Sequence, residues 1–403
     1  MSRERAVAMF VYTDAAHDSR VIREADALHA SGRDVLVVAH TAAGLPAVDE
    51  GRGWRLIRVG EIAALRPGDQ APRDTAARQA RWLAGYARGL DEWANAAARA
   101  AVAWAADHAG IAWHGHDLTG LIAAGRARSH RSGAVVYDSH ELFLEAGAVA
   151  RLPGPARRLV AALERRHARR ADLVITVNRG IATELVARYG IRMPEVVMNC
   201  PHVDPESPPR LASPLRTKLG LGTRPIVLHH GGLSSGRGIT ETIDALEHLP
   251  AEVALVMLGD GELVPKIAER AAGSDRGRLV HHRSVPVDEL AGWVAGADVG
   301  VIAFQPIERN NLLATPNKLF ECLAVGVPVV VSDFPEMGRI VRESKVGATC
   351  DPGSPSSIAA AVGSVLAGDR DAWSTACRTA ATERYSWQRQ AAVLLEAYDR
   401  ISA

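Results

Sequence analysis

Short apolar runs alternate with longer amphipathic stretches along almost the whole of this chain. The runs are apolar on both faces, which is the pattern of strands buried in a parallel sheet. They predict strands at 6–12, 34–40, 54–60, 111–117, 134–140, 173–178 and 195–200 in the first half, and at 226–230, 253–258, 278–283, 298–304, 327–332 and 346–350 in the second.

Most of the stretches between these runs carry apolar side chains at helical spacing. They predict helices that include 19–30, 157–170, 239–248 and 316–324. Strands that alternate with helices in this way indicate an α/β fold with doubly wound parallel sheets.

At 403 residues the chain exceeds one ordinary hydrophobic core, so two domains are expected. Prolines recur through residues 201–225 and can continue neither a central strand nor a helix interior. We therefore expect an N-terminal domain at 1–200, a linker at 201–225 and a C-terminal domain at 226–380. In such sheets a ligand binds at the carboxyl ends of the strands, and two domains favour a cleft between them.

Composition and net charge exclude some classes of function. The apolar fraction of 47% and charged fraction of 23% are those of a folded globular protein. A net charge of +1 gives no global field that would attract nucleic acid. The four cysteines lie far apart, with no metal-ligand spacing, and are expected to be buried thiols of a cytoplasmic protein.

The segment 156–170 predicts a basic amphipathic helix. Two interpretations stay open: a solvated arginine face, which is the commoner case, and a peripheral contact with anionic lipid.

A glycine-rich loop after the strand at 226–230 is a candidate phosphate site. Glycines allow close backbone approach, and the start of the next helix, near Ile239, offers free N–H groups to an anion. Arg237 adds a guanidinium suited to phosphate oxygens. The candidate donor-binding residues of this loop are Gly231, Gly232, Ser234, Ser235 and Arg237. An ordinary strand–helix turn would look similar, so the loop alone does not decide between the two.

A second candidate element spans 315–333. Thr315 is expected to cap a helix that starts at Pro316, with Asn317 and Lys318 in its first turn. Glu321 follows one turn later on the face of Asn317. A carboxylate there can accept both hydroxyls of a ribose while Lys318 binds phosphate.

Two further loops follow predicted strands at the same edge. One contains Gly259, and the other contains Arg283, Ser284 and Val285, whose backbone groups could bind a nucleotide base.

The order GGLSSGRG, LGDGE, ADVGVIAF and TPNKLFECLAVGVPVVVSD resembles the retaining glycosyltransferases of family four in sequence-based classification. In the first half, DSRVIREADALHASGRDVLVV, HGHDLTG, VYDSHELF and ADLVITVNRGIATELVARYG extend the resemblance, as does the closing YSWQRQAAVLLEAY. Residues 61–110 match least.

The resemblance implies a GT-B fold, in which two Rossmann-like domains face a central cleft and a closing helix at 381–403 packs back on the N-terminal domain. It implies that the C-terminal domain binds the donor diphosphate. Gly232 stands where the family commonly has an Arg, Arg237 takes the place of a Lys, and Lys318 is our candidate to replace the missing charge.

The family also often has two glutamates separated by seven residues. The second aligns with Glu321, which would hold the ribose, and the first falls at Leu313. Backbone amides around Leu312 to Thr315, with Leu313, Ala314 and Thr315 as the candidate donor-binding residues, could address sugar hydroxyls or phosphate instead. In the N-terminal domain the resemblance places His140 beside the donor sugar, and Asp117 occupies a similar strand end. These two are the candidate catalytic residues.

A metal site is not expected. His114 and His116 share one face of the predicted strand, whereas Asp117 falls on the other. No cofactor is expected either. The aromatic residues Trp82, Tyr86, Trp93 and Trp104 fall on one face of a helical stretch at 72–109. Core packing is the favoured interpretation, and a hydrophobic acceptor platform is the alternative.

These features predict a metal-independent glycosyltransferase that uses a nucleotide diphosphate sugar, with UDP-sugar favoured, and retains the anomeric configuration. Two alternatives stay open: a nucleotide-sugar epimerase or hydrolase of the same fold, and a non-catalytic partner that binds nucleotide-sugar. The acceptor, whether glycan, lipid or small metabolite, and the oligomeric state are not determined by the sequence.

Overall fold

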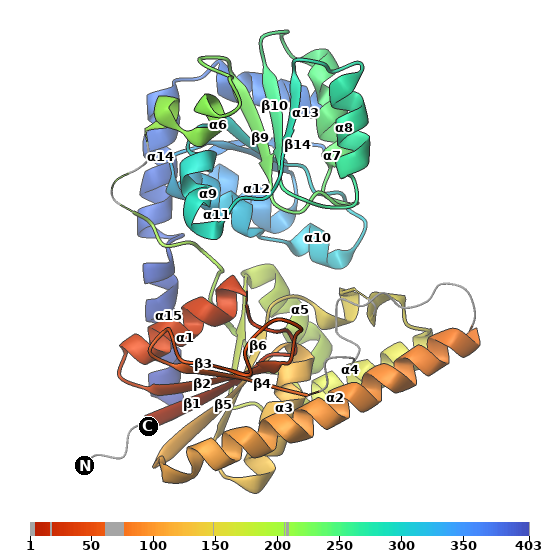
Figure 1. The fold of residues 1–403 in the computed structure, drawn as a ribbon, viewed down its shortest axis with the longest axis vertical. Helices are drawn as coiled ribbons and strands as arrows, with labels where there is room; N and C mark the ends of the chain where they lie inside the picture. Colours follow the sequence, from red (N-terminus) through yellow and green to blue (C-terminus); the bar gives the residue numbers. More distant parts are fainter. Residues whose placement is uncertain are drawn as a thin grey trace. The chain divides into compact units, whose positions relative to one another are not determined.

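A computed structural model describes residues 5–16, 18–60, 76–147, 149–204, 206 and 209–402. The chain divides into two compact units, Met1–Asn199 with Ala391–Ala403, and Cys200–Gln390 (Figure 1). The closing segment thus belongs to the first unit, where the Tyr398 hydroxyl lies 2.6 Å from Nδ1 of His114.

The sheet of the first unit has the order β3-β4-β2-β1-β5-β6-β7-β8. All its neighbouring strands are parallel except β3 and β4. The strands are β1 (Arg5–Phe10), β2 (Asp34–His40), β3 (Val48–Asp49), β4 (Arg55–Val59), β5 (Gly110–His116), β6 (Ala134–Ser139), β7 (Leu173–Thr176) and β8 (Glu195–Val196). All seven predicted strands are present, and only the two-residue β3 was not anticipated.

The helices of the first unit are α1 (Ser19–Ala30), α2 (Ala76–Trp104), α3 (Asp117–His130), α4 (Gly154–Ala168) and α5 (Arg179–Tyr189), with most of α15 (Trp387–Ser402). The Asp18 side chain caps α1 by accepting from the Val21 amide at 3.2 Å. Helix α2 packs against α3, which packs against α4 (Figure 1). The predicted helical stretch at 72–109 therefore exists as α2, although residues 72–75 lie outside the described part.

The sheet of the second unit is wholly parallel, with the order β11-β10-β9-β12-β13-β14. Its strands are β9 (Ile226–His230), β10 (Ala254–Leu258), β11 (Leu279–His282), β12 (Val299–Ile302), β13 (Val329–Ser332) and β14 (Gly347–Cys350). Its helices are α6 (Pro214–Thr217), α7 (Ile239–Asp244), α8 (Val264–Ala272), α9 (Val287–Val294), α10 (Arg309–Leu313), α11 (Asn317–Ala324), α12 (Pro335–Ser344), α13 (Pro355–Leu366) and α14 (Arg370–Glu383).

Part of the predicted linker at 201–225 is structured within the second unit. The Ser213 hydroxyl caps α6 and donates to the Gly292 carbonyl at 2.6 Å. The buried Arg216 guanidinium donates to Asp298 Oδ2 at 2.6 Å. The prolines of this segment had suggested a linker without regular structure. Pro214, however, occupies the first turn of α6, where the missing N–H breaks no hydrogen bond of the helix.

Both sheets reverse their strand order at one point, between β1 and β5 in the first unit and between β9 and β12 in the second. At such a switch point the loops after the two central strands diverge and leave a crevice at their carboxyl ends. Each unit therefore offers a natural ligand site. All four cysteines are buried, as the sequence predicted.

Candidate donor pocket and catalytic residues

The loop after β9 approaches its neighbours so closely that only glycine fits. Gly238 has φ +71°, and a Cβ atom there would lie 1.9 Å from the Ala303 carbonyl oxygen. This residue is the N-cap of α7, which begins at Ile239 as predicted. The left-handed turn therefore brings the start of α7 against the loop after β12.

The second predicted element begins one residue later than expected. Helix α11 starts at Asn317 with Pro316 as its N-cap, and no side chain caps it. The assignment of Thr315 as the cap was wrong, because it required Pro316 to be helical, whereas its ψ is 145° and its backbone is extended. Lys318 and Glu321 nevertheless lie on the same face of α11, one turn apart.

These elements enclose a pocket of about 370 Å³, which we call the β9–α11 pocket. Eleven of the predicted donor-binding residues line it: Gly231, Gly232, Ser234, Arg237, Gly259, Ser284, Val285, Pro316, Asn317, Lys318 and Glu321. The structure thus brings together three loops and a helix that are far apart in sequence.

Five predicted residues are not among those that line the pocket. The Ser235 amide donates to Glu262 Oε1 at 2.9 Å, and the Arg283 side chain is 85% exposed beside Asp260. Leu313 is buried at the end of α10, and Ala314 and Thr315 connect that helix to α11. The selection of Leu313, Ala314 and Thr315 relied on alignment to a motif whose first glutamate this chain lacks.

Sequence reasoning missed two polar or aromatic contributors to this pocket. His230 is the last residue of β9, and its Nε2 atom lies 2.9 Å from Oε2 of Glu321. The Phe304 ring, after β12, lies 4.4 Å from the Arg237 guanidinium carbon and 5.7 Å from Lys318 Nζ. The position of both residues at carboxyl ends of central strands was the available signal.

The side chain of Lys318 is buried beside a second positive charge, which shifts the pKa of its amine. Burial and the nearby Arg237 charge lower the pKa of Lys318 to about 7, although Glu321 opposes this. Its Nζ atom lies 3.1 Å from Nε2 of His229. Burial and the Lys318 charge hold the pKa of His229 well below its usual value, so this imidazole is neutral and accepts from Lys318.

In the first unit the candidate catalytic residues are in contact. Asp117 is not part of β5 but begins α3, with φ +52°, which is rare for a residue with a side chain. Its Oδ1 atom accepts from the His140 amide at 3.0 Å. The Nε2 atom of His140 lies 3.1 Å from Oδ2 of Asp138.

These carboxylates determine the charge of His140. Burial alone would lower the pKa of His140, but Asp117 and Asp138 outweigh it and raise the pKa to about 10. His140 is therefore an imidazolium at neutral pH, a hydrogen-bond donor at both ring nitrogens.

Asp138 belongs to a buried network below His140. Arg20 donates to both oxygens of Asp138, at 2.7 and 2.6 Å, and lies 3.1 Å from Glu24. The rings of His114 and His116 stack at 4.4 Å, on one face of β5 as predicted.

The sequence-based argument against a metal considered Asp117 as the third ligand, whereas the structure places Glu24, His114, His116 and Asp138 within 4.8 Å of one another. The Arg20 guanidinium already supplies positive charge to both carboxylates of this group. Burial lowers the pKa of His114 and of His116, so the ion pairs of this network are those that Arg20 makes with Glu24 and Asp138.

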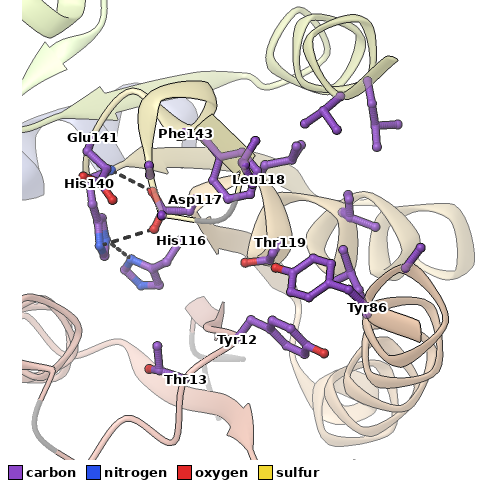
Figure 2. A pocket seen from close by; sticks show the side chains of 18 of the residues that line it. Tyr12, Thr13, Tyr86, His116, Asp117, Leu118, Thr119, His140, Glu141 and Phe143 are labelled. Atoms are coloured by element: carbon purple, nitrogen blue, oxygen red, sulfur yellow. Dashed lines mark hydrogen bonds and ion pairs between the residues drawn. The ribbon is translucent and has the colours of Figure 1, made fainter. Parts of the chain in front are cut away.

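The aromatic residues of α2 divide between core and surface. Trp93 is buried against Tyr12, in agreement with core packing. Trp82 and Tyr86 instead line a second cavity, of about 510 Å³, which we call the α2–α4 pocket. His140 and Asp117 line the same cavity (Figure 2).

Each of the two units matches a model of a known protein family. Residues 224–368 match the family described as glycosyl transferases group 1, and residues 18–202 match a glycosyl transferase 4-like domain. The chain belongs to the group 1 glycosyltransferases.

The relatives of this glycosyltransferase are named for different substrates. A D-inositol 3-phosphate glycosyltransferase of Xylanimonas cellulosilytica is 30% identical over 261 residues, which is 61% of each chain. A glycogen synthase of Mycobacterium tuberculosis is 27% identical over 255 residues, which cover 61% of this chain and 58% of that enzyme. The match thus spans less than two thirds of each of these relatives.

Solved structures show that the glycosyltransferase has the GT-B fold. Sucrose-phosphate synthase from Thermosynechococcus elongatus superposes with a TM-score of 0.73 at 18% identity, covering 98% of this chain and 99% of that one. HepE of Anabaena, in complex with UDP and glucose, superposes with a TM-score of 0.69 at 15% identity and the same coverage. In the described part of this glycosyltransferase, no helix combines the length and apolar character needed to cross a bilayer.

Proposed function

We propose that this glycosyltransferase transfers a sugar from a nucleotide diphosphate sugar, with UDP-sugar as the favoured donor, to an acceptor hydroxyl. The supporting observation is the β9–α11 pocket, where Arg237, Lys318 and the start of α11 converge with the carboxylate of Glu321. Two cations and a helix N-terminus attract a diphosphate, and a carboxylate binds ribose hydroxyls.

In this proposal each side chain has one task. Arg237 and Lys318 bind the diphosphate, and His230 holds the Glu321 carboxylate in place for the ribose. The loop with Ser284 and Val285 contacts the base. The HepE complexes with UDP support the choice of a uridine nucleotide.

The two cations also support transfer without a metal. The departing nucleotide diphosphate carries the charge that develops in the transition state, and preorganised N–H groups with Arg237 and Lys318 stabilise it. Retention of configuration is proposed on the family alone. His140 and Asp117 act on the sugar and acceptor side of the reaction, where the imidazolium donates hydrogen bonds.

The test uses the full-length chain and four probes: UDP, GDP, UDP-glucose and GDP-glucose. Calorimetric titration in the presence of EDTA should give binding of the uridine compounds with at least about tenfold preference. If none of the four binds, the donor assignment is wrong. Binding abolished by EDTA and restored by Mn²⁺ or Mg²⁺ would contradict metal independence.

A second measurement separates transfer from hydrolysis and from epimerisation of the donor. UDP release from UDP-glucose is followed with and without an acceptor mixture of simple sugars, inositol phosphates and alkyl alcohols. Release that requires an acceptor supports transfer. Equal release without acceptor identifies a hydrolase, and interconversion of the donor sugar without release identifies an epimerase.

A further inference from the structure

The α2–α4 pocket lies wholly within the first unit and has the size of a small-molecule site. Its volume of about 510 Å³ falls within the usual range for such sites, roughly 300–1,000 Å³. The loop after β1, the start of α3, and helices α2 and α4 contribute its walls. None of its polar side chains belongs to the proposed donor pocket.

The pocket has one polar end and one apolar end. His116, Asp117 and His140 gather at one side, while the rings of Tyr12 and Tyr86 lie at the other (Figure 2). The lining also includes the aliphatic side chains of Leu83, Leu90, Ile122, Leu152, Val160 and Leu163. A ligand that satisfies both ends has a polar group joined to a sizeable apolar group.

Some of the apolar side chains that line this pocket are exposed to solvent. Leu159 and Leu163, both on α4 and both lining the pocket, are 73% and 38% exposed. The rings of Trp82 and Tyr86 stack at 5.4 Å on α2. Apolar side chains exposed together beside a cavity mark a place that another apolar surface covers.

We propose that the α2–α4 pocket binds the apolar part of the acceptor, an amphiphile with a long alkyl or aryl group whose hydroxyl lies at His140 and Asp117. That this ligand is the acceptor rests on the proposed transfer reaction. A free sugar or inositol phosphate does not fit these walls, because its hydroxyls would be buried against aliphatic side chains without hydrogen bonds.

The polar face of α4 adds a preference for negative charge. Arg158, Arg165 and Arg166 are exposed on this helix and line a groove with Arg169, Arg170 and Arg188. An acceptor with an apolar chain could come from an anionic membrane or from a soluble amphiphile. Both sources share the chemistry that the pocket recognises, and the experiment distinguishes them.

The first test measures binding of hexanol, octanol and decanol to the full-length protein by tryptophan fluorescence. Each added methylene group should tighten binding about fourfold, as full burial of the chain requires. Leu159→Glu should weaken decanol binding at least about fivefold. Met193→Glu is the matched control, because Met193 is 60% exposed in the same unit and does not line the pocket.

Titration of the same variants with UDP-glucose keeps this inference separate from the proposed function. Unchanged UDP-glucose binding with weakened decanol binding supports the pocket assignment. Absence of UDP-glucose binding contradicts the proposed function. The alkanol titrations still test the pocket in that case, because they do not depend on the donor. Affinity that does not depend on chain length, or equal loss in Leu159→Glu and Met193→Glu, overturns the inference.

Co-sedimentation distinguishes the two sources of the apolar chain. Vesicles of phosphatidylcholine with phosphatidylglycerol are compared with vesicles of phosphatidylcholine alone. Selective binding to the anionic vesicles, lost in Arg165→Glu, indicates a membrane lipid. Alkanol binding without vesicle binding indicates a soluble amphiphile.

Discussion

The Nε2 atom of His230 lies 2.9 Å from Oε2 of Glu321, so the last residue of β9 contacts the middle of α11. The two residues are 91 positions apart in sequence and meet in the β9–α11 pocket. This contact fixes the orientation of the carboxylate to which we assign the ribose.

Replacement of that carboxylate should therefore weaken donor binding. We expect Glu321→Ala to reduce the affinity for UDP-glucose by about 2 kcal/mol, the loss of hydrogen bonds to a charged group. Calorimetric titration measures it. The control is Glu343→Ala, because Glu343 is half exposed on α12 in the same unit. An unchanged titration curve for Glu321→Ala would remove Glu321 from the site.

Two arginines near the donor loops should differ in effect. Arg237 lines the pocket, whereas Arg283 is 85% exposed and does not. We expect Arg237→Ala to weaken UDP-glucose binding about tenfold or more, because a charge-assisted hydrogen bond to phosphate is lost. Arg283→Ala should change it by less than about twofold. Equal effects of the two substitutions would mean that the pocket does not hold the diphosphate.

Donor binding should depend on pH through Lys318. With a pKa of about 7, Lys318 is partly neutral in the unliganded protein at neutral pH. A bound diphosphate favours the ammonium, so binding takes up a proton, and affinity should fall as pH rises above 7, by at most about tenfold per unit. Calorimetry in buffers of different ionisation enthalpy measures the uptake. Lys318→Met should abolish it, and Lys266→Met, an exposed lysine on α8, should not.

His140 should keep its charge well above neutral pH. Its pKa of about 10 depends on Asp117 and Asp138, so Asp117→Asn should lower that pKa, as histidine NMR titration can measure. Because the pKa is raised from 6.5, the imidazolium stabilises the fold fully below that pH. This contribution is lost as pH rises through about 10. A wild-type His140 that titrates near 6.5 would contradict the arrangement.

The turn at Gly238 should tolerate no side chain. Gly238→Ala places a Cβ 1.9 Å from the Ala303 carbonyl oxygen at φ +71° and should destabilise the protein by about 2 kcal/mol or more. Thermal unfolding measures the change. At Gly232 a Cβ meets nothing within 4 Å, so Gly232→Ala should unfold at the wild-type temperature. Similar thermal unfolding midpoints for Gly238→Ala and Gly232→Ala would contradict the left-handed turn at Gly238.

The element boundaries follow closely from local pattern. Predicted strands at 34–40 and 226–230 and the predicted helix at 19–30 coincide with β2, β9 and α1. Buried parallel strands are continuous apolar runs, and the helices are marked by capping residues such as Asp18. The start of α11 was misplaced by one residue because Thr315 looked like a better cap than the extended Pro316.

By itself the sequence determined which loops carry charge, glycine and the start of a helix, because these signals are local. It therefore placed Arg237, Lys318 and Glu321 in one candidate site. Only the tertiary structure decided that His230 and Phe304 join them and that Arg283 does not. It also decided that Arg20 meets Asp138, 118 positions away, beneath His140. Such contacts are set by strand order and by burial of charge, which depend on the whole sheet rather than on any one segment.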